Sequence, residues 1–165
     1  MSSLKHIWRT KKLKVKSKLK LLKTCVFSVL LYASETWTLT ESDKKKLLAF
    51  EMKCYRQILG IQWKDMVCNI DIRNKIAAHT TKVDNIKTRK LRLFGHICRM
   101  ADNRFIKHIV FSRMNVMSRR GRTCREWLDD ITQWCSHNCQ DLSHIAQDRN
   151  QWKKLIRKMV GPNRR

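Results

Sequence analysis

The first clear pattern in the chain is a set of apolar residues that recurs at spacings of four, three, four and three. These residues are Val15, Leu19, Leu22, Val26 and Val29. Such spacings place side chains on one stripe of an α-helix, and lysines occupy the opposite side. The pattern therefore predicts one long amphipathic helix from Leu13 to Leu30.

A second helix is predicted between Thr40 and Gly60. Thr40 followed by Asp43 has the form of a capping box, and Gly is the residue type that most often ends a helix. The apolar residues of this stretch cover more than one face, so we expect the helix to be central in the core. A short connection containing Trp63 then leads to a brief helix over residues 69–78.

The next helix is expected to begin at a cap formed by Thr80 or Thr81. Its buried stripe is Val83, Ile86, Leu93, Ile97 and Met100. Gly95 interrupts this helix, and a Gly inside a helix costs about 1 kcal/mol relative to Ala. We therefore expect either another backbone to approach closely at Gly95 or the helix to bend there.

Three further helix starts are predicted in the last third of the chain. Asp102 is expected to cap a fifth segment, and Thr123 with Glu126 has the form of a second capping box. Ser143 is expected to begin the last helix, which stops at Gly161-Pro162. With one Pro and four Gly in 165 residues, little turn chemistry is left for a sheet. The prediction is an all-α fold of about six or seven helices, in one domain or two small helical units.

The charge of the chain changes this picture from a plain helical protein to one that seeks polyanions. Lys and Arg number 37 against 13 Asp and Glu, which gives a net charge of +24 and an isoelectric point near 10.4. No acidic residue occurs before Glu35, a second basic tract runs from Lys87 to Arg125, and a third closes the chain. The alternative is a surface kept soluble by lysine, but such a surface normally has Glu interspersed.

The candidate contacts to phosphate lie in these basic tracts, on helix faces and in the linker Ser118-Arg119-Arg120-Gly121-Arg122. They are Lys14, Lys18, Arg89, Lys90, Arg92, His96, Arg99, Arg119, Arg120, Arg122 and Arg125. The guanidinium groups suit bidentate phosphate contact. Tryptophans at 127, 134 and 152 are able to stack on bases, but their helical spacing favours core packing. His96 is more often a packed or hydrogen-bonded residue than a catalyst.

The sequence lacks the residue patterns of an enzyme. Asp129 and Asp130 are adjacent, but consecutive helix residues point about 100° apart and do not converge on one metal or substrate. There is no Walker phosphate loop, no Gly-x-Ser-x-Gly elbow and no His-Glu-x-x-His helix. We therefore expect no catalytic residues and no cofactor.

The seven cysteines and six histidines raise the question of zinc. The ligand types that cluster together are Cys124, Cys135, His137, Cys139 and His144. No paired Cys-x2-Cys knuckle is present, so core or surface roles are favoured over a metal site. An odd number of cysteines within apolar runs is typical of reduced thiols in an intracellular protein, and no apolar run reaches the ~18–20 residues of a membrane-spanning helix.

Several motifs stand in order along residues 4–160. They are Ile7-Trp8-Arg9 with Lys18-Leu19-Lys20, Val29-Leu30-Leu31-Tyr32-Ala33-Ser34-Glu35-Thr36-Trp37, Phe50-Glu51-Met52-Lys53-Cys54-Tyr55-Arg56, Arg89-Lys90-Leu91-Arg92-Leu93-Phe94-Gly95-His96-Ile97-Cys98-Arg99, Gly121-Arg122 with Trp127-Leu128-Asp129-Asp130, and Ala146-Gln147-Asp148-Arg149 with Trp152. Together they resemble the region after the palm in LINE-type, jockey-like non-LTR retrotransposon reverse transcriptases. The order of the motifs makes the resemblance specific, although each motif alone is weak.

The resemblance implies a thumb-like helical unit over residues 4–60, a basic helical connector over 61–118, a basic linker over 119–125 and a C-terminal helical pair over 126–160. In such polymerases the thumb holds the template and primer duplex, and the tail is expected to contact RNA or target DNA. The family's catalytic palm acids and its endonuclease have no counterpart in this sequence. The family usually has Gly at the position of Ala33 and Pro at that of Thr123.

The leading hypothesis is a non-catalytic remnant of a retrotransposon reverse transcriptase that binds RNA, DNA or an RNA–DNA hybrid, inside the cell and in the nucleus. One alternative is a structural protein that docks on a reverse transcriptase core or associates with itself. Another is a basic amphipathic helix that binds a membrane surface, although its apolar side carries few aromatic residues.

Overall fold

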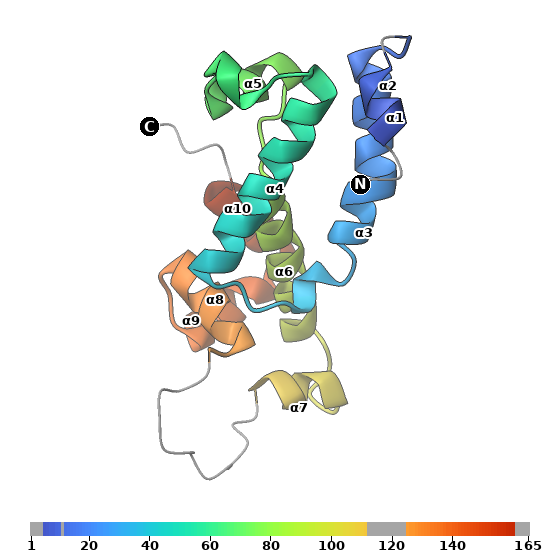
Figure 1. Ribbon diagram of the computed structural model, residues 1–165. Helices are drawn as coiled ribbons and strands as arrows, with labels where there is room; N and C mark the ends of the chain where they lie inside the picture. The colour runs from blue at the N-terminus through green and yellow to red at the C-terminus, as the bar shows by residue number, and fades with distance from the viewer. Residues whose placement is uncertain (1–4, 11, 112–124, 161–165) are drawn as a thin grey trace, which may run out of the picture. The chain divides into compact units, whose positions relative to one another are not determined.

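The computed structural model of the chain describes residues 5–10, 12–111 and 125–160 (Figure 1). All regular elements within these ranges are helical, which confirms the all-α prediction for them. A search of the same residues finds no helix with the length and apolar character needed to span a bilayer. The chain forms two compact units: unit 1 is Met1–Ser34 with Thr40–Asn85, and unit 2 is Glu35–Leu39 with Ile86–Arg165.

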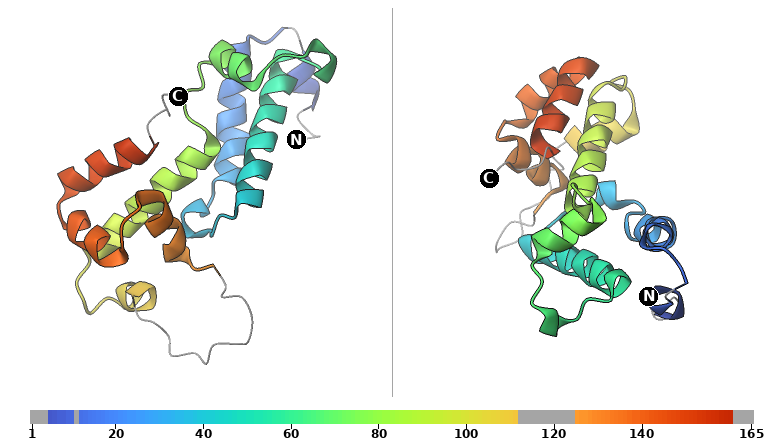
Figure 2. Two further views of the ribbon diagram at one scale, coloured as in Figure 1. Left: turned by 90° about the vertical axis from the view of Figure 1, so that its left-hand side faces the viewer. Right: turned by 90° about the horizontal axis from the view of Figure 1, so that it is seen from above.

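Unit 1 is built mainly from a broken helical stretch that packs on one long helix. Its elements are α1 (Lys5–Arg9), α2 (Val15–Leu21), a π-helix (Leu22–Phe27), α3 (Ser28–Leu30), α4 (Glu41–Leu59), a 3₁₀ turn (Trp63–Asp65) and α5 (Asn69–Ile76). The stretch from α2 to α3 runs beside α4 (Figure 2). The core of unit 1 includes Leu22 of this stretch, Cys54 of α4 and Ile72 of α5, each 0% exposed.

The π-helix changes which residues of the first helix are buried. The expected stripe ends at Val26 and Val29, but Phe27 is buried and Val29 is exposed. A π turn holds one more residue than an α turn, so the step along the buried face from Leu22 is five residues, to Phe27, and the next step is four, to Leu31. A helical stretch is thus present from Val15 to Leu30, but the predicted inner stripe is wrong at Val15 and Val29, which are exposed, while Val26 is partly buried against the core.

Unit 2 is a bundle around the central part of α6. Its helices are α6 (Lys82–Cys98, from Ile86 onward), α7 (Phe105–Phe111), α8 (Trp127–Cys135), α9 (Cys139–Gln147) and α10 (Arg149–Val160). The core joins Phe94 of α6 to Ile131 of α8, Leu142 of α9 and Trp152 of α10. In both views of Figure 2 the last three helices gather along α6.

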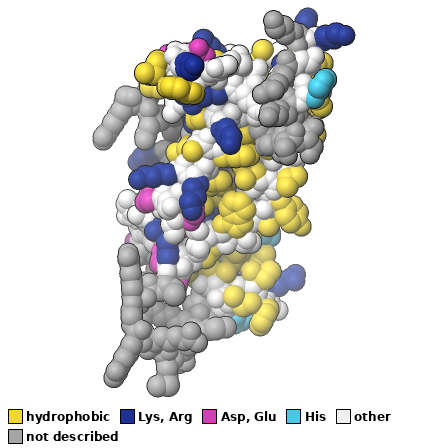
Figure 3. Space-filling model, in the orientation of Figure 1, with side chains coloured by type: hydrophobic (Ala, Val, Ile, Leu, Met, Phe, Trp, Pro, Cys, Tyr) yellow, Lys and Arg dark blue, Asp and Glu magenta, His cyan; other side chains and the backbone are white. Residues whose placement is uncertain are grey.

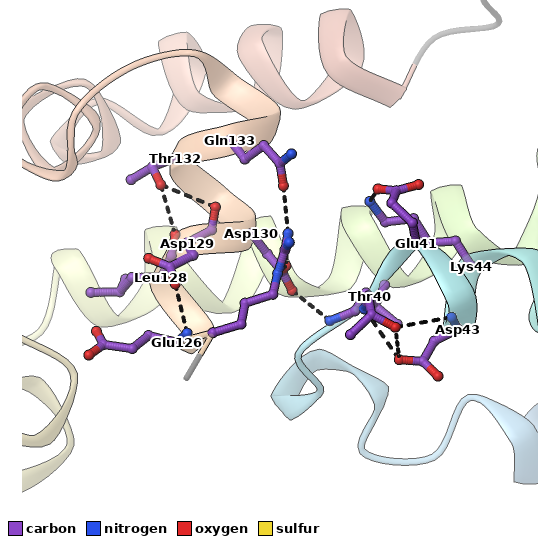
Figure 4. A network of polar contacts seen from close by, with 12 residues as sticks. Thr40, Glu41, Asp43, Lys44, Glu126, Leu128, Asp129, Asp130, Thr132 and Gln133 are labelled. Atoms are coloured by element: carbon purple, nitrogen blue, oxygen red, sulfur yellow. Dashed lines mark hydrogen bonds and ion pairs between the residues drawn. The ribbon is translucent and has the colours of Figure 1, made fainter. Parts of the chain in front are cut away.

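Two helix starts that the sequence predicted are confirmed in atomic detail. The Thr40 and Asp43 side chains and backbones bond reciprocally at the start of α4 (Figure 4). Thr81, not Thr80, does the same with Asp84 at the start of α6. Gly60 ends α4 with φ +71°, in the left-handed region that Gly adopts without steric cost.

Other predicted helix starts are wrong. Asn138 caps α9 by accepting from the Asp141 amide, so this helix begins well before Ser143. Asp148 then accepts from the Asn150 amide and opens α10 as a separate helix. Short polar side chains compete with the backbone for these bonds, and both residues were available as signals in the sequence.

The two other expected caps also differ. Asp102 does not cap α7, which begins at Phe105; its carboxylate instead lies 2.6 Å from Lys107 Nζ. The N-cap of α8 is Glu126, whose amide donates to Asp129 Oδ2 at 2.7 Å. Thr123 lies outside the described residues.

Ala33 is in a backbone conformation that side chains seldom adopt. Its φ is +50°, within the left-handed region that favours Gly. The sequence resemblance led us to expect that Gly is usual at this position. The turn therefore keeps the backbone shape that a Gly would have there, with Ala in its place.

Candidate nucleic-acid interface

The clearest cationic surface among the predicted contacts is a stripe on α6, formed by Arg89, Arg92 and His96. All three side chains are exposed, and their spacings of three and four place them on one face of the helix. The opposite face of the same helix is fixed in the core of unit 2 through Leu91 and Phe94, each 0% exposed. The three side chains are therefore presented by a helix whose rotation is set by packing. We call them the α6 stripe.

Lys90, between the arginines of the stripe, was predicted to contact phosphate, and its placement shows that this prediction is wrong. The side chain is 0% exposed. Its Nζ donates to Asp130 Oδ2 at 2.6 Å and to the Trp37 carbonyl at 2.8 Å. Lys90 lies four residues after Ile86 and four before Phe94, which are both buried, so helix periodicity puts it on the inner face.

Asp130 is the centre of a buried charge cluster in unit 2, which we call the Asp130 node. Besides Lys90, it accepts from the Leu39 amide at 2.9 Å and from Arg125 Nε at 2.7 Å. Arg125 also donates to Gln133 Oε1 at 2.5 Å (Figure 4). Both carboxylate oxygens are thus satisfied, as a buried charge requires.

The electrostatics of the Asp130 node favour a structural role. Burial lowers the pKa of the Lys90 ammonium, while its hydrogen bond and its attraction to Asp130 oppose that shift. The ammonium also lies 5.1 Å from the centre of the Trp127 ring. Arg125 was also predicted to contact phosphate, but its hydrogen bonds to Asp130 and Gln133 hold it in the Asp130 node.

The remaining candidates divide between exposed, internal and undescribed positions. Lys14 is exposed, just before α2. Lys18 was predicted on the outer face but is buried, and its Nζ donates to the Trp8 carbonyl at 2.7 Å. Arg99 is half-buried and donates to the Ala146 carbonyl at 2.5 Å, so its guanidinium ties α6 to α9. The linker arginines at 119, 120 and 122 lie outside the described residues.

Unit 1 has a buried acidic residue that sequence reasoning did not single out. Glu51 is 0% exposed and accepts from Tyr55 Oη at 3.0 Å and Arg73 Nη2 at 3.2 Å. Lys82 Nζ lies 4.0 Å from the same carboxylate. Burial and the negative charge of Glu51 raise the pKa of the Tyr55 hydroxyl. This cluster joins α4, α5 and the first turn of α6 within unit 1.

The zinc-capable residues are not gathered in the part of the chain that the structure describes. Within it, no group of three or more His, Cys, Asp and Glu side chains is placed to hold a metal ion. Cys135 is buried in the core of unit 2 and burial raises its pKa to about 11, whereas His137 and His144 are exposed. Cys124 lies outside the described residues.

Comparison with known proteins gives one informative match. The chain is 25% identical over 153 residues to F52C9.6 of Caenorhabditis elegans, which is described as an uncharacterized transposon-derived protein. The chain is similar to a transposon-derived protein. The match covers 87% of this chain and 55% of the relative, so the chain spans about half of that protein's length. No protein-family model matches the chain, and no solved structure matches it significantly.

Proposed function

We propose that the chain is the thumb and tail part of a LINE-type reverse transcriptase that binds RNA, DNA or their hybrid through phosphate contacts. In this proposal it is not an enzyme and has no polymerase or nuclease centre of its own. The order of the sequence motifs and the similarity to a transposon-derived protein support the origin. The proposal includes a nuclear location, where such a protein meets both nucleic acids, and a reverse transcriptase core as a protein partner.

The observation that carries the binding proposal is the α6 stripe on a chain with a net charge of +24. From Arg89 to His96 the helix rises about 10 Å, which is enough to meet several phosphates of one strand at ~3.4 Å per nucleotide. The stripe faces outward while the other side of α6 is packed. Cations held on a packed scaffold lose less conformational freedom on binding than cations in a tail.

The test is a salt series with matched variants. Binding to a duplex should weaken linearly in log affinity against log salt between ~50 and 200 mM. The double variant R89A/R92A should bind more weakly and reduce the slope by about two, since each lost phosphate contact removes ~0.9. The control K153A/K154A removes the same charge from exposed positions of α10 in the same unit and should change the slope less.

Three results would each count against a different part of the proposal. Affinity that ignores salt over this range would remove phosphate contact as the source of binding. Equal losses in R89A/R92A and K153A/K154A would keep polyanion binding but remove the α6 stripe as its site. Primer extension by the purified chain would overturn the non-enzymatic part.

A second candidate function, self-association or docking on a polymerase core, is favoured by exposed apolar side chains in unit 1. Val29 is 73% exposed and Tyr32 is 80% exposed, close together at the end of α3. Large exposed apolar residues of this kind often mark a protein interface. Light scattering would separate the two readings: a dimer that the variant V29S/Y32S returns to monomer supports self-association, and a monomeric wild-type chain leaves only docking on another protein.

A further inference from the structure

One face of α4 in unit 1 carries both cationic and apolar side chains at the edge of the core of that unit. Its residues follow helical spacing and line a groove of about 1150 Å³. They are Lys45, Leu48, Ala49, Met52, Lys53, Arg56 and Gln57. Met52 of this face also belongs to the buried core of unit 1, whereas the core residues Cys54 and Tyr55 do not line the groove. The sequence predicted apolar residues on more than one face of α4, and Leu48 and Ala49 on this face line the groove.

The far wall of the groove is the turn between α4 and α5, which displays a tryptophan. Trp63 is 78% exposed. Its position is held by hydrogen bonds, because the Gln62 amide donates to Asp65 Oδ2 at 2.7 Å and the Met66 amide donates to the Trp63 carbonyl at 3.3 Å. The indole therefore stands on a closed turn, and Met66 of the same turn and Ile70 of α5 are also exposed. Figure 3 shows exposed hydrophobic side chains over α5, beside Lys or Arg and Asp or Glu side chains.

The groove has positive charge without lining carboxylates. Lys45, Lys53, Arg56 and Arg73 are among its described lining residues, and none of those residues is Asp or Glu. Arg73 is compensated by the buried Glu51. In the part of the chain that the structure describes, no ion pair joins Lys45, Lys53 or Arg56 to an acid, and Arg56 uses one nitrogen to donate to the Val67 carbonyl. Three cations thus remain for an anionic partner.

We propose that this groove binds single-stranded nucleic acid, with the phosphates along Lys45, Lys53 and Arg56 and one base stacked on Trp63. A groove of cations with an exposed aromatic ring is the usual design for binding single strands, because every base has a flat face to stack. The wall formed by α4 runs from Lys45 to Gln57, about 18 Å of helix, which matches about five stacked nucleotides at ~3.4 Å each. This inference rests on the proposed nucleic-acid binding and gives it a preferred strand form.

The stacking part is tested with a ten-nucleotide oligo(A) RNA and a duplex of the same length. W63A should bind the single strand about tenfold or more weakly, while W63F keeps a ring and should lose less. Phe105 provides the matched control, since it is an exposed aromatic residue that does not line the groove, and F105A should bind as the wild type does. Duplex binding should change little in W63A.

The charge part is tested on the same RNA. K45Q/K53Q should reduce the salt slope by about 1.4, because each phosphate contact to a single strand contributes ~0.7. K46Q/K75Q removes equal charge from exposed positions of α4 and α5 that do not line the groove, and it should reduce the slope less.

The possible failures are distinguishable. If W63A binds the single strand as tightly as the wild type, and binding keeps its salt dependence, the groove inference falls and the proposed function stands. If the wild-type chain binds neither probe, the proposed function falls with it. If a polyglutamate peptide of matched charge competes with the RNA and W63A weakens that peptide equally, the groove is a site for acidic protein segments and base stacking is wrong.

Discussion

At the scale of single residues, the Asp130 node shows how a lysine can be charged and internal at once. Lys90 has no exposed surface, and its ammonium meets one carboxylate and one carbonyl. Removing one member of a buried ion pair leaves the other charge buried without its partner, which commonly costs about 3–5 kcal/mol. The node is therefore more sensitive to substitution than the exposed cations around it.

We expect K90M to lower the free energy of unfolding by about 3 kcal/mol. The value lies at the low end of that range because Arg125 still pairs with Asp130. The matched control is R92M, two residues away on the exposed face, which should change stability by no more than about 0.5 kcal/mol. Urea unfolding followed by tryptophan fluorescence measures the stability of both variants. Equal unfolding midpoints for K90M and R92M would contradict a stabilising role of the Asp130 node.

The cysteines give a second prediction at this scale. Cys54 and Cys135 are buried, and burial raises the pKa of each thiol to about 11, whereas Cys25 and Cys68 are exposed. Only the thiolate reacts with alkylating reagents. At pH 8 iodoacetamide should modify Cys25 and Cys68 first and leave the two buried thiols unmodified until urea unfolds the chain. Peptide mass spectrometry reads each site, and early alkylation of Cys135 would contradict the packing of unit 2.

Burial of Lys90 was within reach of the sequence, whereas its partner was not. Helix periodicity sets Lys90 on the line from Ile86 to Phe94, so its position alone indicated a buried side chain. The prediction gave the charge of Lys90 more weight than this position. Asp130 stands forty residues further along the chain. No local pattern connects the two, because the contact depends on how α8 packs against α6.

At the scale of elements, helix starts were predictable where a short polar side chain and a carboxylate stand three residues apart, as at Thr40 and Thr81. Such caps use local hydrogen bonds that the sequence displays. The π-helix Leu22–Phe27 has no such local mark. The π-helix shifts the inner face by one residue. This shift brings Phe27 against Tyr55, where the two rings meet edge-on with their centres 6.1 Å apart.

The prediction at this scale concerns helix packing at Gly95. A Cβ added at Gly95 would overlap the indole of Trp152, which also donates to the Leu91 carbonyl at 2.9 Å. The expected close approach at Gly95 is thus real, but a side chain makes it rather than a backbone. We expect G95A to destabilise the protein by about 1–3 kcal/mol through overpacking, although Ala in an open helix gains about 1 kcal/mol over Gly.

A double-mutant cycle separates packing from helix propensity at this site. W152F replaces the indole with a smaller ring, so G95A should cost less in the W152F background than in the wild type. Thermal unfolding of the four proteins gives the coupling energy. A stabilising G95A, or additive effects of the two changes, would contradict the contact between α6 and α10.

At the scale of the whole molecule, the division into units was the feature least accessible from sequence. The boundary falls within α6, between Asn85 and Ile86, and the segment Glu35–Leu39 belongs to unit 2 although its neighbours on both sides belong to unit 1. Leu39 is held by Asp130, and Glu35 by the Trp127 indole at 2.8 Å. These contacts join residues about ninety positions apart, which no periodicity reveals.

The net charge of +24 makes the last prediction a property of the entire chain. Like charges destabilise a compact state by mutual repulsion, and salt screens exposed charges beyond a Debye length of ~10 Å at 0.1 M. Raising sodium chloride from ~50 to ~300 mM should therefore raise the unfolding temperature. Buried pairs such as Lys90 with Asp130 are screened much less and should not offset the gain.

The control for this salt effect is a variant in which three exposed lysines, Lys12, Lys14 and Lys16, are replaced by glutamate. The triple variant K12E/K14E/K16E changes the charge by two at each of three positions, from +24 to +18, so its unfolding temperature should depend less on salt. The same variant should be more stable than the wild type at low salt, since the repulsion it removes is strongest there. An unfolding temperature that falls as sodium chloride is added would show that attractive pairs between surface charges outweigh repulsion. The excess of cations would then not be explained by the absence of a polyanionic partner.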